Sequence, residues 1–182
     1  LKNEGIDLKS LRPRIDHASI LHDDQIEKMA KYSVSASFLI GHVYYWGEFM
    51  RDNVFGEEKL QLLDRAASLE KRNISYTLHS DFMVTNPDPL QMISIAVNRN
   101  TRNNKDYKIA PNEAVSVESA IRALTSEAAW QVMSEHEIGS IEPKKFADFV
   151  VLDSDPRKVE KENIPEIVVL ETWMDGKRVY SK

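Results

Sequence analysis

Short apolar runs that fit β-strands alternate with longer segments whose apolar residues recur every three or four positions, as in helices. Between residues 14 and 100 the order is strand, helix, strand, helix, strand, helix. The predicted strands are Arg14–Ala18, Val34–Ile40 and Ile74–Leu78, and the predicted helices are Asp23–Tyr32, Glu57–Lys71 and Pro89–Asn100. This alternation predicts an α/β fold in which helices pack outside a parallel sheet.

The pattern changes in the last quarter of the chain. After a polar loop, two helices are predicted, one that Ser116 caps and one from Glu127 to His136 that ends at a left-handed Gly139. Two predicted strands follow, Phe146–Asp153 and Ile167–Met174. Asp175-Gly176 is then the two-residue turn of a hairpin, and Lys177–Tyr180 is its returning strand. We therefore predict two parts, an α/β part in residues 1–137 and an antiparallel element in residues 138–182.

Composition narrows the possible partners. Hydrophobic residues make up 42% of the 182 positions, which is enough for a sizeable core. The net charge of −5, without any basic run, argues against nucleic acid as a partner. No apolar run approaches the roughly 20 residues of a membrane-spanning helix, so a membrane is not an expected partner either. Because cysteine is absent, a metal site would need histidine and carboxylate ligands. The cellular location stays unknown, since the sequence starts at Leu1.

Polar groups stand at the ends of all three predicted parallel strands. His17 ends the first, His42 follows the second, and His79 and Asp81 end the third. The carboxyl ends of parallel strands meet at one edge of a sheet, and imidazole and carboxylate are natural ligands of Zn²⁺. Taken singly, each residue is more often a structural group, such as a turn former. The residues alone therefore leave open a metal site, an acid–base site and an ordinary structural role.

Several ordered motifs resemble a known family. They are Arg14-Ile15-Asp16-His17-Ala18, the run from Ser35 through His42, His79-Ser80-Asp81, Gly139-Ser140-Ile141-Glu142-Pro143-Lys144 and Ala147-Asp148-Phe149-Val150-Val151-Leu152. In this order they resemble the C-terminal part of the amidohydrolase superfamily. The resemblance is to its amidohydrolase-3 group, which includes N-substituted formamide deformylases and exoenzyme-regulator-like proteins.

The resemblance implies a specific fold and chemistry. The family fold is a (β/α)₈ barrel with a small β-sandwich, and the three predicted strands would be barrel strands six, seven and eight. His17 would be a metal ligand, Asp81 a metal ligand and general base, and His42 a substrate or oxyanion contact. The implied activity is hydrolysis of a non-peptide C–N bond in a small amide-like substrate, with one or two divalent ions, zinc first, activating water.

The sequence also departs from the family pattern. The His-x-His of strand one and the bridging ligand of the middle strands are missing, and only about three of eight strands are present. The chain is therefore expected to be a C-terminal fragment that lacks metal and activity by itself. We expect its open strand edges to associate with another copy or with the missing N-terminal part. The alternative function is a non-catalytic regulatory or binding protein on the same scaffold.

Two further features have two interpretations each. Many relatives have glycine where this chain has His79, which is then either a pocket group or, as we favour, a structural histidine that bonds a neighbouring loop. Tyr44, Tyr45 and Trp46 either line a pocket for bulky groups or pack beneath a loop.

Overall fold

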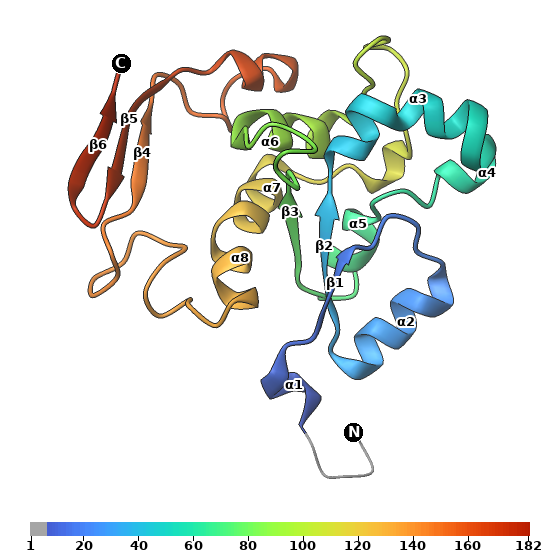
Figure 1. Ribbon diagram of the computed structural model, residues 1–182, viewed down its shortest axis with the longest axis horizontal. Helices are drawn as coiled ribbons and strands as arrows, with labels where there is room; N and C mark the ends of the chain where they lie inside the picture. The colour runs from blue at the N-terminus through green and yellow to red at the C-terminus, as the bar shows by residue number, and fades with distance from the viewer. Residues whose placement is uncertain (1–6) are drawn as a thin grey trace.

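A parallel sheet forms the centre of the protein, as the sequence predicts. The computed structural model describes residues 7–182 (Figure 1). Its first sheet contains β1 (Arg14–His17), β2 (Ser35–Leu39) and β3 (Tyr76–His79), in the spatial order β1-β2-β3. Both neighbouring pairs are parallel, and Ser37 of β2 lies opposite Asp16 of β1 and Thr77 of β3. The carboxyl ends of the strands therefore share one edge, toward which the three arrows point upward in Figure 1.

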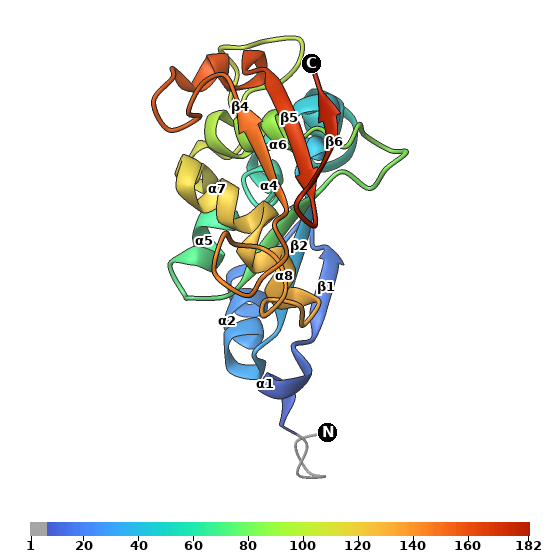
Figure 2. The ribbon, with the colours of Figure 1, turned by 90° about the vertical axis from the view of Figure 1, so that its left-hand side faces the viewer.

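Helices cover one face of this sheet (Figure 2). The helix α2 (Asp23–Tyr32) connects β1 to β2 and buries Ile26 and Met29. After β3 come α6 (Pro89–Asn98) and α7 (Val117–Leu124), whose first turns are capped by Asp88 and Ser116 through backbone N–H groups. All five residues of β2 are buried, whereas all four of β1 are exposed. The core thus lies between β2, β3 and the helices, and β1 is an open edge.

The segment after β2, which carries Tyr44, Tyr45 and Trp46, is helical. A π-helical turn, His42–Trp46, continues into α3 (Gly47–Met50), a second π-helical turn (Arg51–Phe55) and α4 (Gly56–Leu60). The helix predicted from Glu57 to Lys71 is broken. The next helix, α5 (Ala66–Glu70), starts only after Asp64, whose φ is +46°. The break has a clear cause. Arg99 donates hydrogen bonds to the carbonyl oxygens of Leu63 and Asp64, which a continuous helix would use internally.

The second predicted helix of the C-terminal half is shorter than expected. It runs as α8 (Ser126–Gln131) and ends before Met133, whose φ is +61°. Gly139 does adopt a left-handed φ of +89°, but it does not cap this helix. A Cβ at Gly139 would lie 2.5 Å from the Cβ of Ala129, so the loop needs glycine there to pack against α8.

An antiparallel sheet follows, at the left of Figure 1. Its strands β4 (Phe149–Leu152), β5 (Val169–Met174) and β6 (Lys177–Ser181) pair in that order. Asp175 and Gly176 both have positive φ, as the predicted two-residue hairpin requires. The remaining short helices are α1 (Leu8–Leu11), Pro111–Glu113 and Lys161–Glu166. The last of these carries Ile164, which is fully buried, and its Lys161 carbonyl accepts a hydrogen bond from Asn98 of α6. These contacts join the two parts; the boundary after residue 137 stays a prediction.

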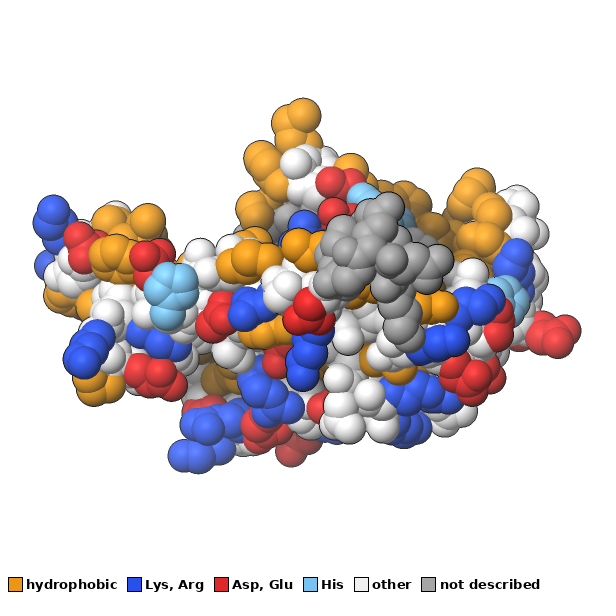
Figure 3. Space-filling view, turned by 90° about the horizontal axis from the view of Figure 1, so that it is seen from below, with side chains coloured by type: hydrophobic (Ala, Val, Ile, Leu, Met, Phe, Trp, Pro, Cys, Tyr) orange, Lys and Arg blue, Asp and Glu red, His pale blue; other side chains and the backbone are white. Residues whose placement is uncertain are grey.

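The surface mixes charges of both signs over the face seen from below (Figure 3). Within residues 7–182, no helix is both long enough and apolar enough to cross a membrane.

Arg99 and Asp64 form a buried polar centre beneath the helices. Both side chains are completely buried, and Arg99 donates to three carbonyl oxygens, of Leu63, Asp64 and Ile109. Within the described residues, the two carboxyl oxygens of Asp64 have no hydrogen-bond partner. Burial raises the pKa of the Asp64 carboxyl to about 8, while the charge of Arg99 acts in the opposite direction.

Asp64→Asn should therefore stabilise the protein increasingly as pH rises. The pKa of Asp64 is higher in the folded state than the roughly 3.9 of an unfolded chain. Its contribution to the free energy of unfolding is complete below about pH 4 and is lost as pH rises to about 8. Urea titrations of both proteins at about pH 5 and pH 8 measure the difference. A variant that loses stability relative to the wild type at the higher pH would show that Asp64 is the ionised partner of Arg99.

The open edge of β1 should cause association of the 182-residue chain. The strand has a partner only on its β2 side among residues 7–182, and Ile15 is 45% exposed. Unpaired backbone groups of such an edge pair readily with another strand. Light scattering should show dimers or larger species, and Ile15→Lys should reduce them, since a charge on an edge strand opposes pairing. A wild-type chain that is monomeric and melts cooperatively would contradict this expectation.

Candidate active site

The carboxyl edge of the parallel sheet brings three of the four predicted side chains together. His17 ends β1, His79 ends β3, and Asp81 follows two residues later. The distance from Nε2 of His17 to Oδ2 of Asp81 is 3.9 Å, and the rings of His17 and His79 meet edge to face with their centres 5.0 Å apart. His17 and Asp81 are nearly half exposed. This edge therefore presents two imidazoles and a carboxylate to solvent.

The backbone at two of these residues is unusual. His17 has a φ of +68° and Asp81 a φ of +48°, in the left-handed region that residues with a Cβ rarely adopt. Neither residue ends a helix, where such a conformation is common. At both positions the chain turns sharply as the strand ends.

His42 lies on the same edge, at the start of the π-helical turn after β2. Its Nδ1 is 3.2 Å from the Ser19 hydroxyl, and its ring meets that of Trp46 edge to face. Burial lowers the pKa of His42, and the nearby His17 and His79 act in the same direction. The uncharged imidazole is therefore favoured. The preceding Gly41 packs so closely on Thr85 that a Cβ would lie 2.7 Å from its methyl group. This contact fixes the start of the turn against the loop that follows Asp81.

A chain of hydrogen bonds holds His79. Its Nδ1 is 2.7 Å from the Ser37 hydroxyl, which is 2.9 Å from the Thr77 hydroxyl. Thr77 is in turn 2.9 Å from Oε1 of Gln131, on α8. Burial is the main cause that lowers the pKa of His79. The interpretation of His79 as a histidine that bonds a neighbouring loop does not fit, since its partner is the adjacent strand.

An open cavity of about 350 Å³ lies between this edge and α8, and His42 is not among the residues that line it. His17, His79 and Asp81 line the cavity at the carboxyl edge of the sheet, and Ser37, Thr77 and Gln131 line it further from that edge. Asp16 and Arg14 lie at its side, and the 2.6 Å hydrogen bond from Arg14 lowers the pKa of the Asp16 carboxyl. Ser19, Ser37 and Gln131 are not among the residues that the sequence predicts for the site. Ser37 could have been found as a hydroxyl on the buried strand before His42, whereas nothing in the sequence links Gln131 to β3.

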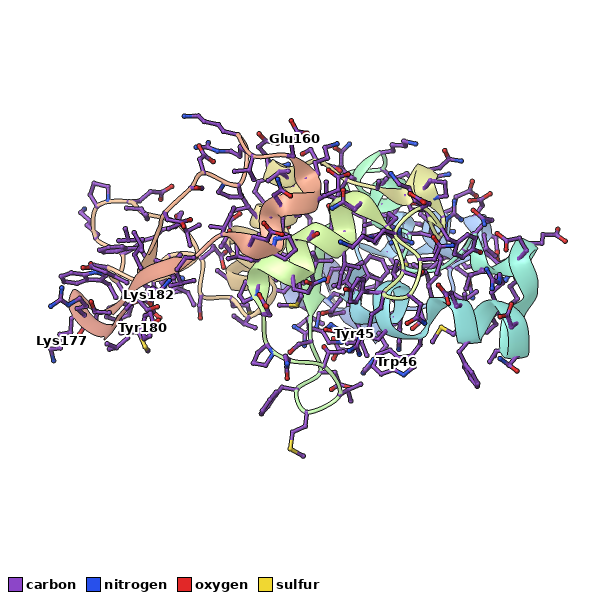
Figure 4. The ribbon with its side chains drawn as sticks, turned by 90° about the horizontal axis from the view of Figure 1, so that it is seen from above. Tyr45, Trp46, Glu160, Lys177, Tyr180 and Lys182 are labelled. Atoms are coloured by element: carbon purple, nitrogen blue, oxygen red, sulfur yellow. The ribbon has the colours of Figure 1, made fainter. Side chains whose placement is uncertain are left out.

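Aromatic and apolar side chains stand beside this edge (Figure 4). The ring centres of Tyr45 and Trp46 are 5.7 Å apart, and Trp46 contacts the His42 ring. Phe82 and Met83, directly after Asp81, are 68% and 86% exposed. Trp46 therefore belongs to the surroundings of the site, as the pocket interpretation expects, and also packs within the turn.

His17 and Asp81 suit a divalent metal ion in kind but are too few in number. Imidazole nitrogen and carboxylate oxygen are ordinary zinc ligands, and two such donors of a tetrahedral ion lie roughly 3.4 Å apart. The observed 3.9 Å is close to that separation. A catalytic zinc normally has three protein ligands. Among residues 7–182, no three histidine or carboxylate side chains converge in a way that could hold a metal ion.

Comparisons with known proteins identify the family of the chain. The model of the amidohydrolase family matches residues 3–180. An N-substituted formamide deformylase from Arthrobacter pascens is 30% identical over 170 residues, which cover 93% of this chain and 31% of the relative. Two crystal structures of uncharacterised metal-dependent hydrolases are also similar. The one from Pyrococcus horikoshii OT3 has a TM-score of 0.71 at 25% identity and covers 82% of this chain. The one from Pyrococcus furiosus has a TM-score of 0.69 at 28% identity and covers 86%.

The chain spans about a third of the length of these proteins, namely 30% and 32% of the two hydrolase structures. Its parallel sheet and its antiparallel sheet are consistent with part of the barrel fold of these hydrolases. The family match covers nearly every residue described above, including all of the candidate site. The chain belongs to the amidohydrolase family.

Proposed function

We propose that this chain is the C-terminal part of a metal-dependent hydrolase that cleaves a non-peptide C–N bond in a small amide-like molecule. The observation that carries the proposal is the approach of His17 Nε2 to Asp81 Oδ2, 3.9 Å apart at the carboxyl edge of a parallel sheet. A family match over residues 3–180 supports it. The similar deformylase is named for acting on N-substituted formamides, which supports a small secondary amide as the substrate class.

His17 and Asp81 would hold a divalent ion, with zinc preferred because of the mixed nitrogen and oxygen donors. When bound, the ion would lower the pKa of a water molecule and polarise the substrate carbonyl. The remaining ligands would come from an N-terminal part of the same protein or from a second copy. The open edge of β1 beside His17 supports an occupant at that position.

Asp81 would act as the general base. Its carboxylate is 44% exposed and therefore reachable by a water molecule. It would take the proton from the attacking water and later give it to the departing nitrogen. The left-handed backbone at Asp81 holds this carboxylate at the strand end, beside His17.

His42 would contact the substrate carbonyl oxygen. The uncharged imidazole can donate from Nε2 when Ser19 donates its hydroxyl proton to Nδ1, 3.2 Å away. A donor directed at the developing oxyanion is typically worth about 3 kcal/mol of transition-state stabilisation. His42 thus has a role that needs no charge, which suits its lowered pKa.

Replacing the proposed base should abolish most turnover. In the full-length protein, Asp81→Asn is expected to lower kcat for an N-substituted formamide by roughly 10²- to 10⁴-fold, because no carboxylate then accepts the proton. Asp106→Asn, at an exposed position in the loop after α6, is the matched control and should leave kcat unchanged. Equal kcat values for the wild type and Asp81→Asn would refute this role. Faster cleavage of dipeptides than of formamides would refute the non-peptide substrate class.

Metal content separates the hydrolase from the alternative of a regulatory or binding protein. Mass spectrometry of the full-length protein should show near-stoichiometric zinc, and the 182-residue chain alone should show none. His17→Ala should remove metal from the full-length protein, whereas His136→Ala should not, since His136 is 71% exposed and lies beside Glu137. No metal in either protein after reconstitution would favour the non-catalytic function.

A further inference from the structure

The hydrogen-bond chain beneath His79 has a defined direction, because one end is a backbone carbonyl. The carbonyl oxygen of Ala36 accepts a hydrogen bond from Nε2 of Gln131 at 2.8 Å. A carbonyl can only accept, so the amide of Gln131 cannot be reversed. Its Oε1 therefore faces Thr77 as an acceptor.

Each further step then has one solution. A hydroxyl has a single proton, and Thr77 must give it to Oε1 of Gln131. Thr77 is consequently the acceptor toward Ser37, 2.9 Å away, and Ser37 donates. Ser37 then has no proton left for His79, so Nδ1 of His79 carries a proton and donates it to Ser37 across 2.7 Å. In a neutral imidazole the other nitrogen, Nε2, is then unprotonated.

We propose that His79 is a substrate-binding residue whose unprotonated Nε2 accepts a hydrogen bond from an N–H group of the substrate. His79 lines the open cavity beside His17 and Asp81, and no hydrogen bond to its Nε2 exists among the described residues. Ser37, Thr77 and Gln131 act as positioning residues, because they hold the ring and fix its tautomer. Their substitution should change which nitrogen carries the proton.

Together with His42, this assignment defines a substrate class. His42 would donate to a carbonyl oxygen, and His79 would accept from an N–H, so the edge offers one donor and one acceptor. A secondary amide supplies the N–H that the acceptor of His79 needs. A tertiary amide has no N–H and would leave the acceptor of His79 unused. The inference deepens the proposed function and depends on it for the His42 contact.

The tautomer can be measured without any turnover. In the full-length protein with isotope-labelled histidine, NMR of the ring nitrogens should show that Nδ1 of His79 is protonated and that Nε2 is unprotonated. Ser37→Ala removes the acceptor and should release the ring to the opposite tautomer. Ser35→Ala is the matched control, since Ser35 is buried on the same strand but its hydroxyl bonds the Pro13 carbonyl instead. A wild-type His79 with a proton on Nε2 would overturn the inference.

Binding tests the ligand class. In the Asp81→Asn protein, which should not consume the probe, N-benzylformamide should shift the Nε2 signal of His79, and its N-methylated tertiary counterpart should not. Equal shifts with both probes, or none with either, would overturn the assignment.

Kinetics separate this inference from the proposed function. His79→Ala should lower kcat/KM for the secondary formamide roughly two- to tenfold, the value of one neutral hydrogen bond, and leave the tertiary one unchanged. An enzyme that hydrolyses both probes with the same loss in His79→Ala keeps the proposed function and refutes the inference. A protein that binds the secondary probe at His79 and hydrolyses neither keeps the inference and refutes the hydrolase.

Discussion

Parallel pairing of three short strands is the constraint on which the candidate site depends. The pairing sets Asp16, Ser37 and Thr77 side by side, and one or two residues further along each chain come His17, Leu39 and His79. Because all three strands point the same way, their terminal side chains meet at one edge, although the outermost two, His17 and His79, are more than 60 positions apart in sequence. The complete burial of β2 between its neighbours keeps this alignment rigid.

The same edge uses serine hydroxyls to orient histidines. The Ser19 hydroxyl is hydrogen-bonded to Nδ1 of His42, and the Ser37 hydroxyl is hydrogen-bonded to Nδ1 of His79. The two arrangements differ in how strongly they are determined. The Ser37 chain ends at a backbone carbonyl, which fixes each proton, whereas the Ser19 hydroxyl has only a long 3.4 Å contact with the His17 carbonyl oxygen as a competing acceptor. One ring is therefore set as an acceptor toward the cavity, and the other can serve as a donor.

Buried polar groups determine where the helices break. Arg99 donates hydrogen bonds to the carbonyl oxygens of Leu63 and Asp64, so the chain cannot continue as one helix into α5. Glu113 anchors the start of α5 in a similar way, by accepting from the Ser68 backbone N–H and from Arg65. These interactions are satisfied only in the folded state, since each joins residues that are more than 30 positions apart. They connect the helices behind the sheet and thereby support the strand ends in front.

The sequence by itself determined the α/β order and the parallel sheet, because both follow from local periodicity. It also determined the hairpin at Asp175-Gly176, through turn chemistry, and the position of His17, His42 and Asp81 at strand ends, through contiguous motifs. Only the tertiary structure decided the rest. The break at Asp64, the helical aromatic segment after β2 and the early end of α8 depend on Arg99, on packing and on backbone conformations that no local pattern encodes. The role of His79 depends on Gln131, which lies 52 positions away and reaches β3 only when α8 packs beside it. Hydrogen bonds between distant segments are properties of the folded arrangement, and a single sequence shows their donors and acceptors without showing which of them meet.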